Sequence, residues 1–258
     1  MLNPHINLQS KTVLITGASQ GIGLATAKVL AGYGATVVLA ARSIDKIHHA
    51  VANIRQAGGA AHGVVCDVTD YLSVSAAVDA TLAHTGCIDV LVNNAGVIDP
   101  LTSLVDSDPA LWSHAVDVNL KGVYFSMRAV LPHMIKLGSG TVVNMSSGAA
   151  NSALEGWSNY CSTKAAAKKV TEVAHAEVGA QGIKVIGLSP GTVATDMMAK
   201  IRDAQINAVS RLAWSSHIPP EWVGEGVAYL CSPDSDDLAG SDFSLKTPEG
   251  RARVGLPA

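Results

Sequence analysis

The amino-acid sequence predicts an α/β fold in which one parallel β-sheet is covered by helices on both faces. Six short runs of apolar, largely β-branched residues recur along the 258 residues. Each run is almost continuously apolar rather than alternating, which is typical of strands buried on both faces of a parallel sheet. Longer helix-prone segments separate the runs. Repeated strand, helix, strand units imply right-handed crossovers and a doubly wound sheet of about seven strands.

The predicted strands cover residues 12–16, 35–40, 63–68, 88–95, 140–147 and 183–189, and the stretch from Ser241 onward supplies a seventh strand and a tail. The sequence contains no Pro/Gly/Ser-rich linker and no low-complexity tract, so residues 1–258 are expected to form a single domain. Residues 197–222 are less regular, because the pair Pro219 and Pro220 interrupts any helix there. Two interpretations stay open for this segment: it covers a ligand site, or it is an ordinary surface loop.

The composition excludes several classes of protein. Hydrophobic residues make up 48% of the chain and charged residues 15%, which is not the composition of a disordered protein, and the apolar runs are too short to span a bilayer. A formal net charge of -3 without a basic stripe argues against nucleic-acid binding. The start, MLNPHINLQS, lacks the pattern of a secretory signal, so we expect a cytoplasmic protein without membrane association.

The cysteines and histidines do not form a metal-binding pattern. The four cysteines lie far apart, with no Cys-x-x-Cys pair, and are expected to be reduced thiols. His48 and His49 are adjacent, so on a helix their side chains point about 100° apart and cannot share a metal ion. No metal site is predicted.

A glycine-rich turn, TGASQGIG, follows the first predicted strand directly and precedes a helix-prone segment. Glycines at Gly17, Gly21 and Gly23 allow a tight turn and close approach of a phosphate to backbone N–H groups, and the helix N-terminus favours negative charge. The turn lacks the Gly-Lys-Ser/Thr of a P-loop, which favours a dinucleotide over a nucleoside triphosphate. A Rossmann-like site is therefore predicted, with Ser19, Gln20 and Ile22 completing the turn.

Arg42 is the residue that bears on the choice of dinucleotide. The second predicted strand ends in LAARS, with no acidic residue at positions 40 or 41 to hold the ribose hydroxyls of NAD. An arginine there pairs with a ribose 2′-phosphate, whereas a carboxylate repels it, so we expect NADP(H) rather than NAD(H). The alternatives are that Arg42 faces solvent and that Asp45 reaches the ribose of NAD.

Tyr160 and Lys164 lie four residues apart in the alanine-rich stretch GWSNYCSTKAAAKK. On a helix they share one face, so a phenol and an ammonium can converge on one point. Such a pair is an acid/base device, but alone it is weak evidence because it arises easily by chance.

Seven motifs together closely resemble the short-chain dehydrogenase/reductase family in order and spacing, over residues 10 to 245. They are TGASQGIG (16–23), DVT (67–69), NNAG (93–96), VNLKG (118–122), VVNMSS (142–147), YCSTK (160–164) and SPGTVATD (189–196). The resemblance implies that Tyr160 is the catalytic acid/base and that Lys164 lowers its pKa and holds the nicotinamide ribose. It further implies that Ser147 binds the substrate oxygen and that Asn119 supports a water-linked proton relay. The family's spacing of thirteen residues before the tyrosine selects Ser147 over Ser146.

The same resemblance implies the remaining cofactor contacts. It assigns Asp67 and Val68 to the adenine and Asn94, Ala95 and Gly96 to the length of the cofactor. Around the nicotinamide carboxamide it assigns Pro190, Gly191, Val193 and Thr195.

The sequence departs from the family pattern in two places. Many NADP-dependent members carry a basic residue where this chain has Gln20, and the C-terminus lacks the frequent ending V-D-G-G. A narrower resemblance to the sepiapterin reductase-like branch rests on AARS, GWSNYCSTKAA, PGTVATDM and the pair Asp242-Phe243. In that branch Asp242 is expected to anchor a polar substrate such as a pterin.

These observations predict an oxidoreductase that transfers a hydride between NADP(H) and a carbonyl or alcohol substrate. The alternatives are an NAD-dependent alcohol dehydrogenase, a sepiapterin-like pterin or diketone reductase, and a non-catalytic dinucleotide-binding sensor. Substrate choice is expected to depend on residues 197–222 together with Ala149, Leu154 and Trp157. The family resemblance also implies a homo-oligomer, a dimer or tetramer, that packs the predicted helices 108–137 and 158–180 across subunits.

Overall fold

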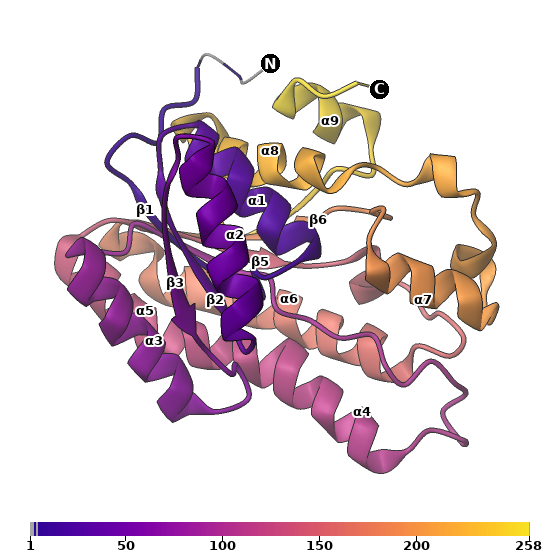
Figure 1. Cartoon of the computed structure of the whole chain (residues 1–258). Helices are drawn as coiled ribbons and strands as arrows, with labels where there is room; N and C mark the ends of the chain where they lie inside the picture. Colours follow the sequence, from indigo (N-terminus) through magenta and orange to yellow (C-terminus); the bar gives the residue numbers. More distant parts are fainter. Residues whose placement is uncertain (1–2, 4, 258) are drawn as a thin grey trace.

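Seven parallel strands form one sheet in the order β3-β2-β1-β4-β5-β6-β7. This sheet is the centre of a computed structural model that describes residue 3 and residues 5–257 (Figure 1). The chain forms a single Rossmann-like α/β domain, as the sequence predicts. The strands are β1 (Thr12–Thr16), β2 (Thr36–Ala41), β3 (Ala60–Val65), β4 (Val90–Asn93), β5 (Gly140–Met145), β6 (Ile183–Ser189) and β7 (Asp242–Ser244).

Six helices cover the two faces of the sheet. One face carries α1 (Gly21–Gly32), α2 (Ile44–Gln56) and α8 (Pro220–Leu230), and the other carries α3 (Tyr71–Thr85), α5 (Gly122–Leu137) and α6 (Ser158–Val178). Alternate residues of β1 serve opposite faces: Val13 and Ile15 pack with the first helix layer, and Leu14 packs with the second. Burial on both faces explains why the strands are apolar throughout rather than alternating.

Three predicted strands extend past the observed ends, and the fifth strand in chain order, predicted at 140–147, ends at Met145. The third strand was predicted at 63–68 but runs from Ala60 to Val65, so Asp67 and Val68 lie in the loop beyond it. The fourth was predicted at 88–95 but ends at Asn93, because the backbone N–H groups of the next two residues donate to the Thr16 hydroxyl instead of continuing the ladder. For the third and fourth strands, apolar or buried residues continue past the last ladder hydrogen bond, and hydropathy alone cannot locate that point.

The predicted helix 108–137 has an irregular turn in its middle. It consists of α4 (Pro109–Val116), a π-helical turn (Asp117–Lys121) and α5. This turn carries Asn119, whose side-chain oxygen accepts from the Val97 N–H at 2.8 Å and whose amide donates to the Val97 carbonyl at 2.9 Å. Such π-turns often occur at functional sites because they redirect side chains.

The segment 197–222 is more regular than the sequence indicates. It contains most of α7 (Asp196–Ala204) and two short 3₁₀ turns (Ala208–Arg211 and Trp214–Ser216) before α8 begins at Pro220. Met198 and Ile201 of α7 join a small hydrophobic cluster with Trp157 and Ala149, at the end of the sheet where α6 begins. The remaining helix, α9 (Pro248–Val254), lies near the C-terminus. None of the helices in the described part of the chain combines the length and apolarity that a membrane crossing requires.

Candidate active site

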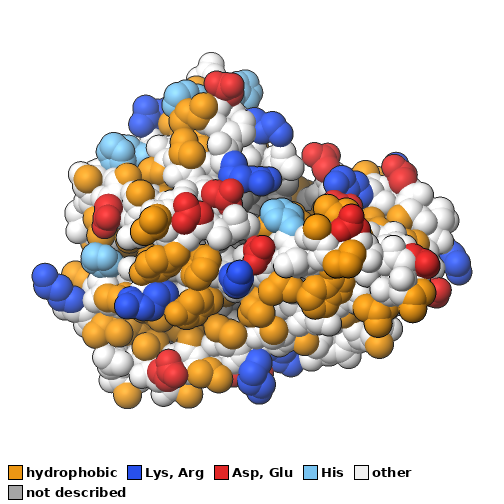
Figure 2. Space-filling model, turned by 90° about the horizontal axis from the view of Figure 1, so that it is seen from below, with side chains coloured by type: hydrophobic (Ala, Val, Ile, Leu, Met, Phe, Trp, Pro, Cys, Tyr) orange, Lys and Arg blue, Asp and Glu red, His pale blue; other side chains and the backbone are white. Residues whose placement is uncertain are grey.

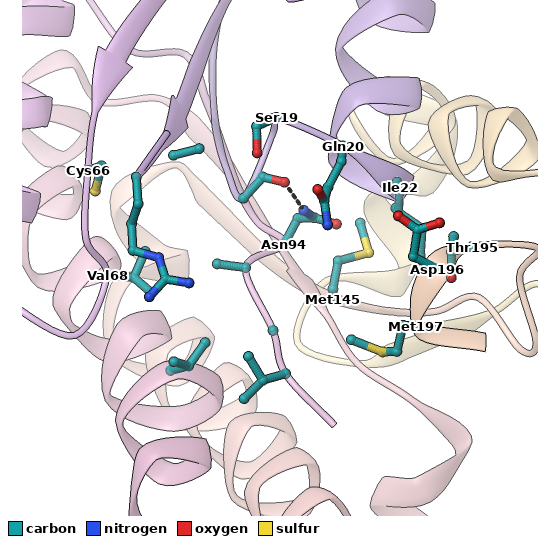
Figure 3. A pocket seen from close by; sticks show the side chains of 18 of the residues that line it. Ser19, Gln20, Ile22, Cys66, Val68, Asn94, Met145, Thr195, Asp196 and Met197 are labelled. Carbon is teal, nitrogen blue, oxygen red and sulfur yellow. Dashed lines mark hydrogen bonds between the residues drawn. The ribbon is translucent and has the colours of Figure 1, made fainter. Parts of the chain in front are cut away.

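A cavity of about 490 Å³ opens at the carboxyl edge of the sheet, where β1 lies between β2 and β4 and the chain connections reverse direction. Ligands of doubly wound proteins bind at this topological switch point. In Figure 3 the glycine turn, with Ser19, Gln20 and Ile22, lies on one side of the cavity, and Thr195, Asp196 and Met197 lie beside it. The predicted site residues that line the cavity are Gly17, Ser19, Gln20, Gly21, Ile22, Arg42, Asp67, Val68, Asn94, Ala95, Gly96, Tyr160, Lys164, Pro190 and Thr195.

The glycine turn is shaped by close backbone contacts. Gly17 has a φ of +65°, and a Cβ atom on it would lie 2.8 Å from the Ala95 Cα. A Cβ on Gly23 would lie 2.5 Å from Asn94 Nδ2 and 2.7 Å from the Gly17 carbonyl oxygen. Gly23 therefore lies beneath the turn and supports it, outside the cavity lining.

Asn94 holds this turn in place. Its side-chain amide donates to the carbonyl oxygens of Thr16 at 2.9 Å and Gly17 at 3.2 Å (Figure 3). The N-cap residue of α1, Gln20, makes no capping hydrogen bond with its side chain. No capping side chain therefore accepts from the first N–H groups of α1. An anion bound at this end of the helix would meet these hydrogen-bond donors and the positive end of the helix dipole.

Two cations line the end of the cavity beyond β2. Arg42 follows β2 directly, and Lys46, in the first turn of α2, donates to the Gln20 side-chain oxygen at 3.0 Å. Asp67 lies at the same end. Its burial opposes ionisation, but hydrogen bonds from Thr69 and the charge of Arg42 hold the pKa of its carboxyl below the ordinary value. Asp45, the alternative ribose partner, is not among the lining residues.

The opposite end of the cavity holds the predicted catalytic groups. Tyr160 and Lys164 lie one turn apart on α6, and the Lys164 ammonium is 5.6 Å from the centroid of the Tyr160 ring. Lys164 Nζ donates to the Met145 carbonyl oxygen, the last of β5, at 2.6 Å. The Ser147 hydroxyl lies close enough to the Tyr160 phenol to lower its pKa, and it accepts from the Ala149 N–H at 3.2 Å. The structure thus brings three of the four predicted catalytic residues together.

Asn119 is the fourth, and it supports the site from behind. It is fully buried and does not line the cavity. Besides its two contacts with Val97, its amide donates to the Thr163 hydroxyl at 3.2 Å, which links the π-turn to α6.

Burial controls the protonation of the catalytic pair. It raises the pKa of the Tyr160 phenol, against the lowering effect of the Ser147 hydrogen bond. Burial also lowers the pKa of the Lys164 ammonium to about 8, while the charge of Asp242 acts in the opposite direction. Burial is the largest influence on the phenol, and the lowering of its pKa by Lys164 stays a prediction.

The predicted residues of the loop after β6 divide between lining and support. Pro190 and Thr195 line the cavity, and the Thr195 hydroxyl caps α7 by accepting from the Met198 N–H. Gly191 has a φ of +81° and does not line the cavity. Val193 is buried and pairs with Ile218 in an isolated β-bridge, which ties this loop to the segment before α8.

Asp242 does not have the position that the narrower resemblance predicts. It is the first residue of β7 and does not line the cavity; its carboxylate accepts from the Ser146 hydroxyl at 3.0 Å. Ser146 lines the cavity, whereas the predicted Ser147 is not among its lining residues. Sequence reasoning also missed Lys46, which lies four residues after Arg42, and Met197 at the start of α7.

With this geometry in view, comparisons with known proteins define the family. Residues 11–206 match the family model described as short chain dehydrogenase. The chain is 36% identical over 243 residues to cis-4-hydroxycyclohexanecarboxylate dehydrogenase of Sinomonas cyclohexanicum, which covers 91% of this chain and 94% of the relative. The chain belongs to the short-chain dehydrogenase/reductase family and is an NAD(P)-dependent oxidoreductase.

Solved structures agree on the fold and differ in dinucleotide. An actinorhodin polyketide ketoreductase with NADPH superposes with a TM-score of 0.84 at 28% identity, covering 91% of this chain and 95% of that one. A 3-ketoacyl-(acyl-carrier-protein) reductase of Brucella melitensis complexed with NADH gives 0.83 at 30% identity, covering 93% and 98%. Members of similar fold therefore use either dinucleotide, and the choice in this chain depends on its own residues.

The packing of Gly23 beneath the turn generates a prediction for Gly23→Ala. The new methyl group overlaps Asn94 and the Gly17 carbonyl, and displacing the turn costs about 1–3 kcal/mol. We expect NADPH and NADH affinity, measured by quenching of intrinsic fluorescence, to fall together by about fivefold to 100-fold. Gly148→Ala is the matched control, because a Cβ there meets nothing within 4 Å. Unchanged affinity in Gly23→Ala would show that the turn does not form the dinucleotide site.

Proposed function

We propose that this protein reduces a carbonyl group to an alcohol with NADPH as the hydride donor, and that Ser147, Tyr160 and Lys164 carry out the proton chemistry. The observation that carries the proposal is the layout of one cavity: an anion-binding glycine turn and two cations at one end, and a phenol with its hydroxyl and ammonium partners at the other. Both groups of residues line one cavity at the carboxyl edge of the sheet, which suits a bound dinucleotide.

The residues present fit this cofactor. Glycine at position 17 leaves the turn open where a side chain would collide with Ala95, and the uncapped N-terminus of α1 offers donors for a pyrophosphate. When bound, the nicotinamide supplies the hydride. Lys164 would hold its ribose, and Asn94, Ala95 and Gly96 would lie along its length.

Tyr160 is the proton donor in the proposed reduction. Burial keeps its phenol protonated at neutral pH, so it can donate to the substrate oxygen as the adjacent carbon accepts the hydride. The Ser147 hydroxyl stabilises the charge that develops on the same oxygen. The Lys164 ammonium stabilises the phenolate left on Tyr160 until solvent returns a proton, and Asn119 positions the π-turn against α6 for that relay.

Tyr160→Phe tests the catalytic assignment. Removing the phenolic hydroxyl removes the general acid, and we expect kcat to fall about 100-fold to 10,000-fold while the dissociation constant for NADPH changes less than about threefold. The measurement follows loss of reduced-nicotinamide absorbance against a panel of ketones, diketones, quinones and pterins. Tyr124→Phe, on the exposed surface of α5, is the control and should retain activity. Retained turnover in Tyr160→Phe would remove the phenol from the mechanism.

The preference for NADPH over NADH is proposed from Arg42 and Lys46. Gln20 lacks the positive charge that many NADP-dependent relatives have, but the Lys46 ammonium lies 3.0 Å from its side-chain oxygen and supplies a second cation at the same place. A ribose 2′-phosphate there would pair with both cations, whereas NAD gains nothing from either.

Arg42→Ala, alone and with Lys46→Ala, tests this preference. Loss of a charge-assisted hydrogen bond costs about 1.5–3 kcal/mol, so we expect KM for NADPH to rise about 10-fold to 100-fold with KM for NADH nearly unchanged. Arg128→Ala, at an exposed position of α5 outside the cavity, is the control. Equal effects on both dinucleotides would instead favour the alternative, an NAD-dependent alcohol dehydrogenase.

The substrate is proposed to bind beneath residues 197–222. Two contacts hold this segment: Lys200 pairs with Asp99 at 2.9 Å, and the Asn207 amide donates to the Glu155 carbonyl at 2.8 Å. The cluster that α7 joins, with Ala149, Leu154 and Trp157, is apolar. An apolar or cyclic carbonyl compound suits this cluster. Relatives named for cyclohexane- and cyclopentane-derived alcohols are consistent with that choice.

Two other readings of the site are less well supported. A sepiapterin-like pterin or diketone reductase would need Asp242 in the cavity, where the structure does not place it. A non-catalytic dinucleotide sensor has no use for a phenol placed beside Ser147 and Lys164. A cytoplasmic location is also part of the proposal, because all four cysteines are free thiols, as expected in a reducing compartment.

A homo-oligomer is proposed from the apolar surface of the face seen from below. Figure 2 shows hydrophobic side chains gathered on this face, where α3, α4, α5 and α6 lie. Leu111 of α4, Tyr124 of α5 and Val173 of α6 are each about half exposed, at 48%, 51% and 49%. Exposed apolar patches of this kind mark protein interfaces.

Light scattering during size-exclusion chromatography checks this proposal. We expect a mass two or four times that of the chain at micromolar concentration, and a shift toward monomer when Leu111 and Val173 are both changed to Lys. A wild-type protein that elutes as a monomer at these concentrations would contradict it.

A further inference from the structure

A row of polar positions crosses the sheet beneath α6. Asn93 of β4, Asn144 of β5, Gly187 of β6 and Asp242 of β7 lie side by side in the strand register. Residues in register point to the same face of a parallel sheet. The Asn93 amide donates to the Asn144 side-chain oxygen at 2.8 Å, and the Asn144 amide donates to the Thr171 hydroxyl of α6 at 2.8 Å. Asp242 is therefore directed toward the helix that carries Tyr160 and Lys164.

The Asp242 carboxylate lies at the end of this row and is partly buried. One oxygen, Oδ2, accepts from the Ser146 hydroxyl at 3.0 Å, and the other, Oδ1, is buried without a hydrogen-bond partner. Gly187 makes room for it, because a Cβ at that position would lie 2.5 Å from Oδ1. A buried carboxylate with an unpaired oxygen is costly, so a compensating positive charge is expected nearby.

Two ammonium groups, those of Lys168 and Lys164, act on the Asp242 carboxylate, and Lys164 is the buried one. Its side chain is buried, with the residue 5% exposed, and Nζ donates to the carbonyl oxygen of Met145, the residue before Ser146. The two charged groups are thus connected through one short stretch of backbone at the end of β5. An interior ammonium is stable only when a counter-charge or several hydrogen bonds compensate for lost hydration.

Besides Lys164, two charged groups face Asp242, both from α6. Lys168 donates to the Asn151 side-chain oxygen at 2.8 Å, and Glu172 pairs with Lys169. Both lie toward solvent, where water screens their charges, and their opposite signs act on Asp242 in opposite directions. Lys164 is the buried partner.

We propose that ionised Asp242 is the counter-charge of Lys164, a positioning residue that keeps the ammonium protonated beside Tyr160. The proposal rests on the proposed reduction for its kinetic consequence, although the ionisation of Asp242 can be measured independently. It assigns a role to a β7 residue that neither binds the dinucleotide nor lines the cavity.

The sign of the effect on pH dependence follows from the protonation states. Reduction requires Tyr160 protonated and Lys164 as ammonium, so activity is present at low pH and is lost as pH rises through the first proton loss of this pair. Burial lowers the pKa of Lys164 to about 8, and Asp242 opposes that lowering. Removing the negative charge favours proton loss from either member of the pair, so the alkaline loss of activity moves to lower pH.

The pH profile of kcat for NADPH-dependent reduction tests the proposal in wild type, Asp242→Asn and Ser146→Ala. Asp242→Asn keeps the size of the side chain and removes its charge. The alkaline limb of its profile, where kcat falls as the pH rises, should move to lower pH by about one unit. Ser146→Ala removes the hydrogen bond but keeps the charge, so its limb should stay within about 0.3 unit of the wild type. A limb that is unchanged in Asp242→Asn, or that moves equally in both variants, would overturn the proposal.

A second measurement needs neither activity nor a folded Asp242 variant. The measurement is ¹³C NMR of wild-type protein labelled at the aspartate carboxyl carbons. The Asp242 signal is assigned as the one whose chemical shift changes in Ser146→Ala. We expect it to report an ionised carboxylate from pH 7 to 9, and a carboxyl that stays protonated in that range would refute the counter-charge. Failure of the wild type to reduce any carbonyl, with Asp242 ionised, would refute the proposed function while leaving the counter-charge supported.

Discussion

The hydrogen bond from Lys164 to the Met145 carbonyl is the contact on which the arrangement of the site depends. At 2.6 Å it joins the first turns of α6 to the last residue of β5. Two residues further along the chain, Ser147 lies beside Tyr160 and lowers the pKa of its phenol. Since β5 pairs with both β4 and β6, the position of the catalytic groups is transmitted to the whole carboxyl edge of the sheet.

Around this contact the protein places an unusual number of polar groups in its interior. Hydrogen bonds join Asn93, Asn144 and Thr171 between the sheet and α6, and those of Asn119 join the π-turn, the loop after β4 and α6. Networks of this kind specify one arrangement of helix and sheet, because any slip leaves buried groups unpaired. Apolar packing alone would tolerate small shifts of α6 that a catalytic hydrogen bond cannot.

Local patterns were sufficient for the architecture and for most of the site. Continuous apolar runs predicted the parallel sheet, the glycine turn predicted one end of the cavity, and the family resemblance predicted the catalytic residues at the other. The rest depends on contacts between residues far apart in sequence. The end of β4 is set by the Thr16 hydroxyl, Gly23 supports the turn through Asn94, and Asp242 reaches its position only because β7 pairs with Gly187. No pattern within a short window encodes these contacts.

The most direct test of the central claim, that this cavity transfers a hydride, is the fate of deuterium from NADPH labelled at nicotinamide C4, prepared separately as each of the two stereoisomers. The product alcohol is analysed by mass spectrometry after reduction by the wild-type protein in ordinary water. The account predicts one deuterium on the former carbonyl carbon from one stereoisomer and none from the other, because a single binding geometry presents one face of the ring. Deuterium released to solvent, or transfer from both stereoisomers alike, would contradict it.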